Sequence, residues 1–241
     1  MKKHIPNAIT CLNLLCGCLA LAFIFASGLP NLVVGAYLVG LAAVADFFDG
    51  LVARALRVSS PIGKDLDSLA DMVSFGVVPG AILFQLLKAA LRPQVVPGAL
   101  AYYLPYAAFL VTIFSALRLA KFNNDTRQTN SFIGLPTPAC TLVVASLPLI
   151  LAAHTGAPTA LTSLVLNPWA LLALTGLLSG LLVAELPLFA LKFKNFGWAD
   201  NRQRFVFLLS ALAMVVVLRA AAVPLAVLLY VALSAVRRRP A

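Results

Sequence analysis

The stretch DFFDGLVARALRVSSPIGKDLDSLAD, residues 46–71, decides how this chain folds, because it joins two apolar segments through a short polar turn. It also holds five of the chain's eight acidic residues. These are Asp46, Asp49, Asp65, Asp67 and Asp71. A carboxylate among apolar residues costs free energy unless it is paired or binds a ligand, so a cluster of five needs a physical explanation.

The flanking sequence is that of a membrane protein. The chain is 62% hydrophobic and only 11% charged, which excludes an ordinary soluble domain. Many segments approach the roughly 20 apolar residues that cross a bilayer. We predict an all-α integral membrane protein, residues 1–241 forming one domain, with about eight spans (seven is the alternative). The spans lie near residues 8–27, 31–53, 66–91, 98–120, 135–153, 168–190, 204–218 and 222–236.

The net charge of +10 is explained by topology. With the N-terminus in the cytoplasm, 15 of the 18 Lys and Arg residues lie on the cytoplasmic side, in agreement with the positive-inside rule. The excess can also attract anionic membrane lipids. Nucleic-acid binding is therefore not expected. The same orientation places residues 46–71 at the cytoplasmic face.

Helical spacing brings four of the five aspartates together. Asp46 and Asp49 are separated by three residues and share a face near the end of one helix. Gly63, Asp67 and Asp71 recur every fourth residue and share a face at the start of the next helix. Two helices joined by a short turn run antiparallel, so we expect the two acidic faces to meet.

Four converging carboxylates repel one another unless protons or cations neutralise them. Oxygen ligands of this kind suit Mg²⁺ or Mn²⁺, and two ions sharing the site would suit phosphoryl chemistry. Gly50 leaves room for close approach, and Arg54 and Lys64 bring positive charge suited to phosphate oxygens. The alternative is a set of helix-end charges paired with nearby cations, which we expect for Asp65.

These residues resemble a family signature. The pattern Asp46-x2-Asp49-Gly50-x2-Ala53-Arg54-x8-Gly63-x3-Asp67-x3-Asp71 is similar to the motif of the CDP-alcohol phosphotransferases. The resemblance implies a six-helix core, here about residues 5–191, plus about two extra C-terminal helices at about 204–236. It implies transfer of a phosphatidyl or related group with release of CMP. It further implies two divalent cations on the four aspartates, Asp71 as general base, and Gly50, Ala53, Arg54 and Gly63 against the CDP moiety.

Other stretches narrow the resemblance to bacterial membrane-type phosphatidylserine synthases. They are IPNAITCLNLLCG, ADMVSFGVVPG, ALRLAKFN and FIGLPTPA, within about residues 5–140. The implied substrates are CDP-diacylglycerol and L-serine, in a bacterial cytoplasmic membrane, with a homodimer as a family-level expectation. We favour direct metal-assisted attack by the serine hydroxyl over an enzyme nucleophile, because neighbouring Ser68 and Ser74 have no histidine partner.

Two further groups are candidate substrate contacts. Asn7, Thr10 and Asn13 recur every third residue and share a face of the first span, where they could hydrogen-bond the nucleotide or its phosphates. Asn7, Thr10 and Lys64 are our candidates for CDP binding. Ordinary bonds between helices are an equal contender for the three residues of the first span. Arg118, Lys121 and Asn123 end the fourth span and are candidates for serine binding, Arg118 for its carboxylate. Lysine and arginine there also suit simple membrane-surface anchors.

Three other functions are weighed against this one. A related enzyme would use glycerol 3-phosphate or an inositol phosphate, and we would then expect more basic residues near the site. A cation transporter would place acids near the bilayer midplane, often in two related halves, whereas this chain has one acidic cluster and no visible repeat. A non-catalytic scaffold would not need four aspartates in register.

Overall fold

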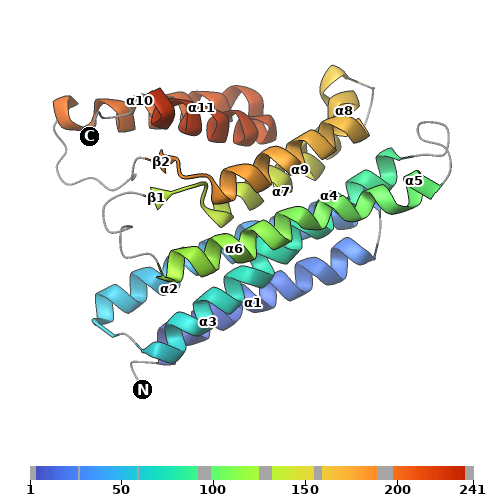
Figure 1. The fold of residues 1–241 in the computed structure, drawn as a ribbon. Coiled ribbons are helices and arrows are strands. Elements are labelled where there is room, and N and C mark those ends of the chain that lie inside the picture. The colour runs from blue at the N-terminus through green and yellow to red at the C-terminus, as the bar shows by residue number, and fades with distance from the viewer. Residues whose placement is uncertain are drawn as a thin grey trace.

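The computed structural model describes residues 4–26, 28–58, 60–91, 99–124, 132–154, 159–188 and 198–236. These residues form a bundle whose long helices lie side by side along one direction (Figure 1). In chain order the elements are α1 His4–Phe25, α2 Leu29–Leu56, α3 Pro61–Asp71, η1 Met72–Val77, α4 Val78–Ala90, α5 Ala99–Tyr103, η2 Leu104–Phe109, α6 Leu110–Asn124, β1 Phe132–Ile133, α7 Thr137–Ala153, α8 Ala160–Val165, α9 Pro168–Val183, β2 Pro187–Leu188, α10 Trp198–Leu218, η3 Arg219–Ala221 and α11 Ala222–Val236.

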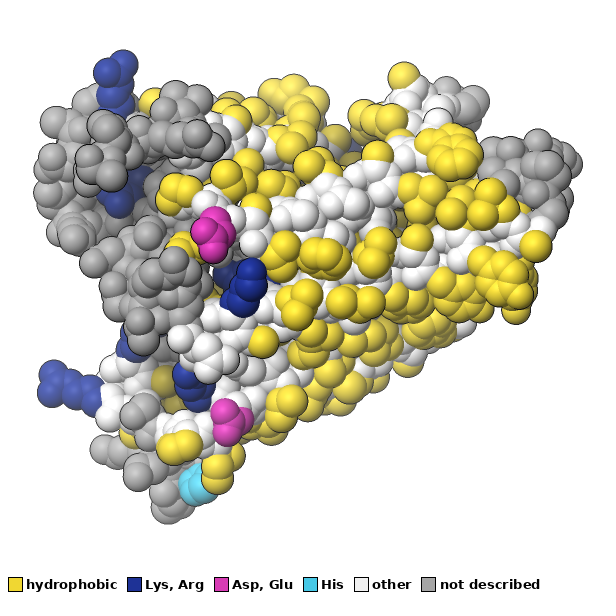
Figure 2. Space-filling model, in the orientation of Figure 1, with side chains coloured by type: hydrophobic (Ala, Val, Ile, Leu, Met, Phe, Trp, Pro, Cys, Tyr) yellow, Lys and Arg dark blue, Asp and Glu magenta, His cyan; other side chains and the backbone are white. Residues whose placement is uncertain are grey.

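The prediction of an all-α integral membrane protein is confirmed. Among the described residues, five helical runs are long and apolar enough to cross a bilayer: His4–Phe25, Leu29–Leu56, Pro61–Ala90, Ala99–Asn124 and Arg204–Ser234. Two apolar helices, α7 and α9, are shorter. Apolar side chains cover most of the visible outer surface, while charged side chains gather at one end (Figure 2). The count of eight crossings stays a prediction.

The largest departure from the predicted spans is at the end of α9. We predicted a span to residue 190, but the helix ends at Val183 and exposed Glu185 lies beyond it. Pro187 cannot donate a helical hydrogen bond, and it instead pairs with Ile133 in the short antiparallel ladder of β1 and β2. The ladder and the six-residue α8 were not predicted, because an apolar sequence does not show where a helix gives way to another backbone form.

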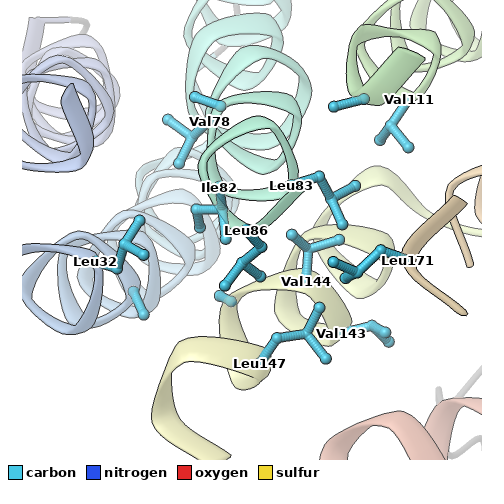
Figure 3. Close-up of a cluster of buried hydrophobic side chains, with 14 of the residues drawn as sticks. Leu32, Val78, Ile82, Leu83, Leu86, Val111, Val143, Val144, Leu147 and Leu171 are labelled. Atoms are coloured by element: carbon cyan, nitrogen blue, oxygen red, sulfur yellow. The ribbon is translucent and has the colours of Figure 1, made fainter. Parts of the chain in front are cut away.

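The apolar core surrounds α4, in which nine of the 13 residues are buried. Val78, Ile82, Leu83 and Leu86 are at most 1% exposed. They belong to one cluster of buried apolar side chains that also includes residues of α1, α2, α6, α7 and α9, part of which Figure 3 shows. Burial on all sides of α4 holds the preceding segment, α3, in place at the charged end of the bundle.

A π-helix joins α3 to α4 without a break. Residues Met72–Val77 adopt this wider form directly after Asp71. Pro79 has no N–H to donate to the Phe75 carbonyl one turn earlier, and its ring crowds that carbonyl, so the helix widens here. The Thr141 hydroxyl of α7 lies 2.9 Å from the Phe75 carbonyl and 2.9 Å from the Thr137 carbonyl of its own helix. Thr112 of α6 donates to the Gly76 carbonyl at 2.9 Å. Hydroxyls of two neighbouring helices therefore reach backbone carbonyls of the π-helix.

Candidate active site

The acidic cluster lies where α2 ends and α3 begins. Carboxylate oxygens of Asp46, Asp49 and Asp67 all lie within 4.8 Å of one another. Asp46 and Asp49 come from α2 and Asp67 from α3, so the expected meeting of the two acidic faces is present. Asp49 is only 7% exposed, and the other two are half-buried.

The turn between the helices is built from local signals. Arg57 ends α2 in the left-handed conformation, with φ of 52°, and its N–H and that of Val58 donate back to the carbonyls of Arg54 and Ala53. Ser60 then caps α3, because its hydroxyl accepts from the N–H of Gly63 at 3.0 Å. Pro61 occupies the first helical position, where its missing N–H is not needed. This tight reversal makes α2 and α3 antiparallel.

Asp71 lies one turn beyond Asp67, on the side of the cluster that faces the π-helix. Its carboxyl interacts directly with that of Asp46. It is not part of the tight group of three oxygens described above. The four aspartates are therefore together, but Asp71 is set apart at the inner edge of the cluster.

Helix α1 contributes two polar side chains to the cluster. The hydroxyl of Thr10 donates to Asp49 Oδ2 at 2.6 Å, and Asn13 Nδ2 donates to Asp71 Oδ1 at 3.4 Å. Both residues are buried, with exposures of 3% and 0%. The shared face of α1 expected from their spacing is thus turned toward the aspartates.

A cavity of about 250 Å³ opens beside the cluster. It is lined by the following residues, which come from α1, the end of α2, the turn and the start of α3: Pro6, Asn7, Thr10, Asp49, Gly50, Ala53, Val58, Ser60, Gly63, Lys64 and Asp67. Six of the predicted CDP contacts are among them, which are Asn7, Thr10, Gly50, Ala53, Gly63 and Lys64.

The two motif glycines keep this cavity open. A Cβ at Gly63 would lie 3.0 Å from Asn7 Oδ1 and from Ser60 Oγ, so a side chain there would press into the wall. A Cβ at Gly50 would lie 3.7 Å from a guanidinium nitrogen of Arg54, which places that group beside the glycine. Arg54 itself is exposed and does not line the cavity. A planar or phosphorylated ligand could therefore approach the backbone of both helices closely.

Arg118 is near Asp71 and does not line the cavity. It is 7% exposed and within electrostatic reach of Asp71. Its Nε donates to the Leu135 carbonyl at 2.9 Å, and its guanidinium lies 5.2 Å from the centre of the Phe122 ring. The chain segment before α7 thus holds a buried cation beside the innermost aspartate.

The other two predicted serine contacts are placed differently. Lys121 is exposed, and Asn123 donates through Nδ2 to Ser68 Oγ at 2.8 Å on the exposed surface of α3. The Lys64 ammonium donates to the Asn123 carbonyl at 3.4 Å. These bonds tie the end of α6 to α3, so the structure gathers Arg118 with the aspartates but leaves Lys121 and Asn123 at the surface.

Comparison with known proteins identifies the family. The family model of the CDP-alcohol phosphatidyltransferases matches residues 3–185, which include every helix around the acidic cluster. The chain belongs to the CDP-alcohol phosphatidyltransferase family. Membership makes the protein a transferase, and it explains why the motif residues of α2 and α3 meet at one cavity.

Curated members of this family resemble the chain over more than half its length. A protein of Bacillus subtilis is 33% identical over 140 residues, covering 56% of this chain and 70% of that protein. A protein of Helicobacter pylori is 32% identical over 149 residues, and one of Methanocaldococcus jannaschii is 34% identical over 140 residues. The matches cover 54% and 58% of those two proteins and 58% of this chain in each case. All three are named CDP-diacylglycerol–serine O-phosphatidyltransferase.

The donor set of this family member fits a hard divalent cation. Three carboxylate oxygens within 4.8 Å of one another, drawn from two helices, are the ligands that Mg²⁺ and Mn²⁺ prefer. The Thr10 hydroxyl of α1 holds Oδ2 of Asp49, which restrains the rotation of this carboxylate. The residues present therefore suit a cation.

Two buried polar residues close in the chain to Arg118 and Leu135 were not singled out by sequence reasoning. Ser115 and Thr137 are at most 1% exposed, and each has a buried hydroxyl without a hydrogen-bond partner among the described residues. Ser115 lies one turn before Arg118, and Thr137 begins α7 just after Leu135. The only available signal was a small polar residue within an apolar segment, which is also typical of ordinary bonds between membrane helices.

Proposed function

We propose that the protein transfers the phosphatidyl group of CDP-diacylglycerol to the hydroxyl of L-serine and releases CMP. The observation that carries this proposal is the juxtaposition of the acidic cluster with the cavity formed by the motif residues. The family match supports the reaction class, and the names of three relatives support serine as acceptor.

The cavity is proposed to hold the CDP moiety. Asn7 and Thr10 lie on one wall, Gly50 and Ala53 on the end of α2, and Gly63 and Lys64 on the start of α3, all within the lining of one cavity. Arg54 beside Gly50 and the Lys64 ammonium offer positive charge to the diphosphate oxygens. The acyl chains would then extend along the apolar outer surface that Figure 2 shows next to the charged end of the bundle.

The four aspartates are proposed to hold the cation. Asp46, Asp49, Asp67 and Asp71 would bind two divalent ions, Mg²⁺ or Mn²⁺. Such ions neutralise charge on the diphosphate and make CMP a better leaving group. The protein's own contribution is to fix these carboxylates from two helices before substrate arrives, so that little reorganisation accompanies the reaction.

Asp71 is proposed to act as the general base that accepts the proton of the serine hydroxyl. The hydroxyl oxygen forms a bond to the β-phosphorus, the bond from that phosphorus to the oxygen of CMP breaks, and the electron pair leaves with CMP. Because the hydroxyl is a weak acid, a base must accept its proton as the new bond forms. Asp71 is set apart from the tight oxygen group and lies near Arg118, which suits it to this role.

Arg118 is proposed to bind the serine carboxylate. It is a buried cation within reach of Asp71, and one nitrogen is already held by the Leu135 carbonyl. Lys121 and Asn123 remain candidates at the surface, where they could assist the approach of serine. A guanidinium can bind a carboxylate with two parallel hydrogen bonds, so it would place the serine hydroxyl reproducibly.

The location and assembly of the enzyme follow from the same proposal. We place the N-terminus and the acidic cluster at the cytoplasmic face of a bacterial inner membrane, since the basic residues are so strongly biased to that side. The six-helix core would be residues 5–191, and the C-terminal helices 204–236 would be additions to it. A homodimer is inferred from family resemblance alone.

The decisive experiment measures CMP release from CDP-diacylglycerol by the purified full chain. Serine, glycerol 3-phosphate and an inositol phosphate are supplied in turn, with a chelator as the control for cation dependence. We expect release with serine and its loss on chelation. Release that requires another alcohol would refute the acceptor assignment. A phosphatidyl group attached to the enzyme in the absence of serine would refute direct transfer.

A further inference from the structure

We propose that α1 positions the aspartates of the site: Thr10 orients Asp49 as a cation ligand, and Asn13 orients Asp71 as the proton acceptor. This inference deepens the proposed function and rests on it. The position of α1 in the cavity wall would by itself suggest only contact with the nucleotide. The inference gives α1 a different role, which is to orient the aspartates.

The first bond fixes a carboxylate that would otherwise rotate. Thr10 and Asp49 are 3% and 7% exposed, so water does not compete for their hydrogen bond. At 2.6 Å the bond is within the range of a strong hydroxyl-to-carboxylate interaction. The hydroxyl has one proton and donates it to Asp49, although the Pro6 carbonyl also lies 3.1 Å away. Because Thr10 holds Oδ2, the carboxylate keeps one orientation beside Asp46 and Asp67.

The second bond fixes the inner aspartate from the same helix. Asn13 is three residues after Thr10 and therefore lies on the same face, and its Nδ2 donates to Asp71 Oδ1. The backbone carbonyl of Asn13 accepts a bond from Ser74 Oγ at 3.1 Å. Ser74 belongs to the π-helix that begins directly after Asp71. The side chain and the backbone of one residue thus hold both Asp71 and the segment that follows it.

The buried amide of Asn13 has a further unused group. Its Oδ1 is buried and has no hydrogen-bond partner among the described residues. Buried acceptors in proteins are rarely left without a donor, so this oxygen is available for a group that arrives with substrate. An acceptor hydroxyl or ammonium beside Asp71 would supply such a donor. Asn13 would then hold Asp71 on one side of its amide and face the arriving acceptor on the other.

A purely structural role makes a different prediction from a positioning role. A bond that merely joins helices is made by Thr112, whose hydroxyl donates to the Gly76 carbonyl of the π-helix. Thr10 and Asn13 instead donate to carboxylates of the motif. Loss of a positioning residue should therefore change ligand affinity or turnover in a protein whose fold is retained. Second-layer partners of metal ligands typically change affinity by about 10–100-fold.

The Asn13 bond is tested by separating turnover from substrate binding. Asn13→Leu keeps a side chain of similar size but removes the amide. We expect kcat to fall by about tenfold or more, with the KM for CDP-diacylglycerol within about threefold of the wild-type value. An unchanged kcat, or a loss confined to KM, would overturn the assignment of Asn13 as the residue that orients Asp71.

The Thr10 bond is tested by measuring Mn²⁺ binding to the purified full chain without substrate. The electron paramagnetic resonance signal of free Mn²⁺ reports how much of the ion is bound. Thr10→Val removes the hydroxyl at nearly constant shape, and Thr10→Ser restores it. The matched control is Thr175→Val on α9, whose buried hydroxyl bonds only the Leu171 carbonyl of its own helix. We expect the dissociation constant to rise about tenfold for Thr10→Val and to stay within about threefold for the other two.

Three results would decide against the inference. Thr10→Val could bind Mn²⁺ as tightly as wild type, Thr175→Val could lose as much affinity, or only the KM for CDP-diacylglycerol could change, as for a direct nucleotide contact. Thr10→Ala serves the same comparison if Thr10→Val does not elute as folded protein. The CMP-release assay could show that this protein uses an alcohol other than serine. The inference about Thr10 still holds in that case if Thr10→Val weakens Mn²⁺ binding. If serine is the acceptor but Mn²⁺ affinity does not depend on Thr10, the inference about Thr10 is wrong while the proposed function stands.

Discussion

Replacement of Gly17 by alanine tests how closely α1 must approach the π-helix. A Cβ at Gly17 would overlap Ser74 Oγ and would lie 3.1 Å from Ser74 Cα. The hydroxyl can rotate away, but it then loses its bond to the Asn13 carbonyl, which contributes about 0.5–1.5 kcal/mol. The contact with the backbone remains, and crowding of this kind costs about 1–3 kcal/mol. We expect Gly17→Ala to lower the free energy of unfolding by about 2–4 kcal/mol.

The measurement is thermal unfolding of the purified protein in detergent, together with CMP release. A loss of this size corresponds to a fall in the midpoint of roughly 4–16 °C for a chain of this length. Turnover should fall as well, because α1 also carries Asn13 and Thr10. The matched control is Gly40→Ala on α2, where a Cβ would meet nothing within 4 Å. This control should keep the wild-type midpoint or raise it slightly, since alanine favours helix over glycine.

A second variant locates the source of the effect. Ser74→Ala removes the hydroxyl that Gly17→Ala would overlap, so the double variant should recover part of the lost stability. The remaining loss would reflect the contact of the new Cβ with the Ser74 backbone. Equal midpoints for Gly17→Ala and Gly40→Ala would refute the reasoning, because α1 and the π-helix would then not be in the close contact described here.

Three further predictions concern the substrates. Asp71→Asn should lower kcat by about 10²–10⁴-fold in the CMP-release assay, because the amide cannot accept the hydroxyl proton; an effect below threefold would exclude it as the base. Arg118→Ala should raise the KM for serine about tenfold or more and leave that for CDP-diacylglycerol unchanged, whereas equal effects on both would indicate a structural role. Gly63→Ala should raise the KM for CDP-diacylglycerol several-fold, since its Cβ would press within 3.0 Å of Asn7 Oδ1, and Gly176→Ala on α9, with open space around it, should not.

The meeting of the acidic faces was predictable from spacing alone. Asp46 and Asp49 follow the helical period on one side of the turn, and Asp67 and Asp71 follow it on the other. The turn itself has local signals, which are the capping Ser60 followed by proline. Because each pair lies within two helical turns and the two helices are joined by a short turn, the covalent chain and the helix geometry largely determine this meeting.

The surroundings of the cluster were only partly predictable. The sequence placed Thr10 on the face of α1 that meets the site, but it did not show that Asp49 would be its partner. The hydroxyl and the carboxylate are 39 residues apart, and their contact depends on how α1 packs against α2. The same holds for Arg118, whose Nε binds the carbonyl of Leu135 in a segment that leads into another helix. Helical spacing indicates a face of a helix but not the neighbour that this face meets.

The sequence by itself determined the membrane class, the helical register of the aspartates and the motif of the family, since each depends on composition or short-range period. Only the tertiary structure decided that α1 supplies the hydrogen bonds to Asp49 and Asp71, that Pro79 is accommodated by a π-helix, and that a cavity opens against Gly63. The physical reason is that these features arise where segments distant in the chain are packed together. There, a buried donor finds whichever acceptor the packing brings within reach.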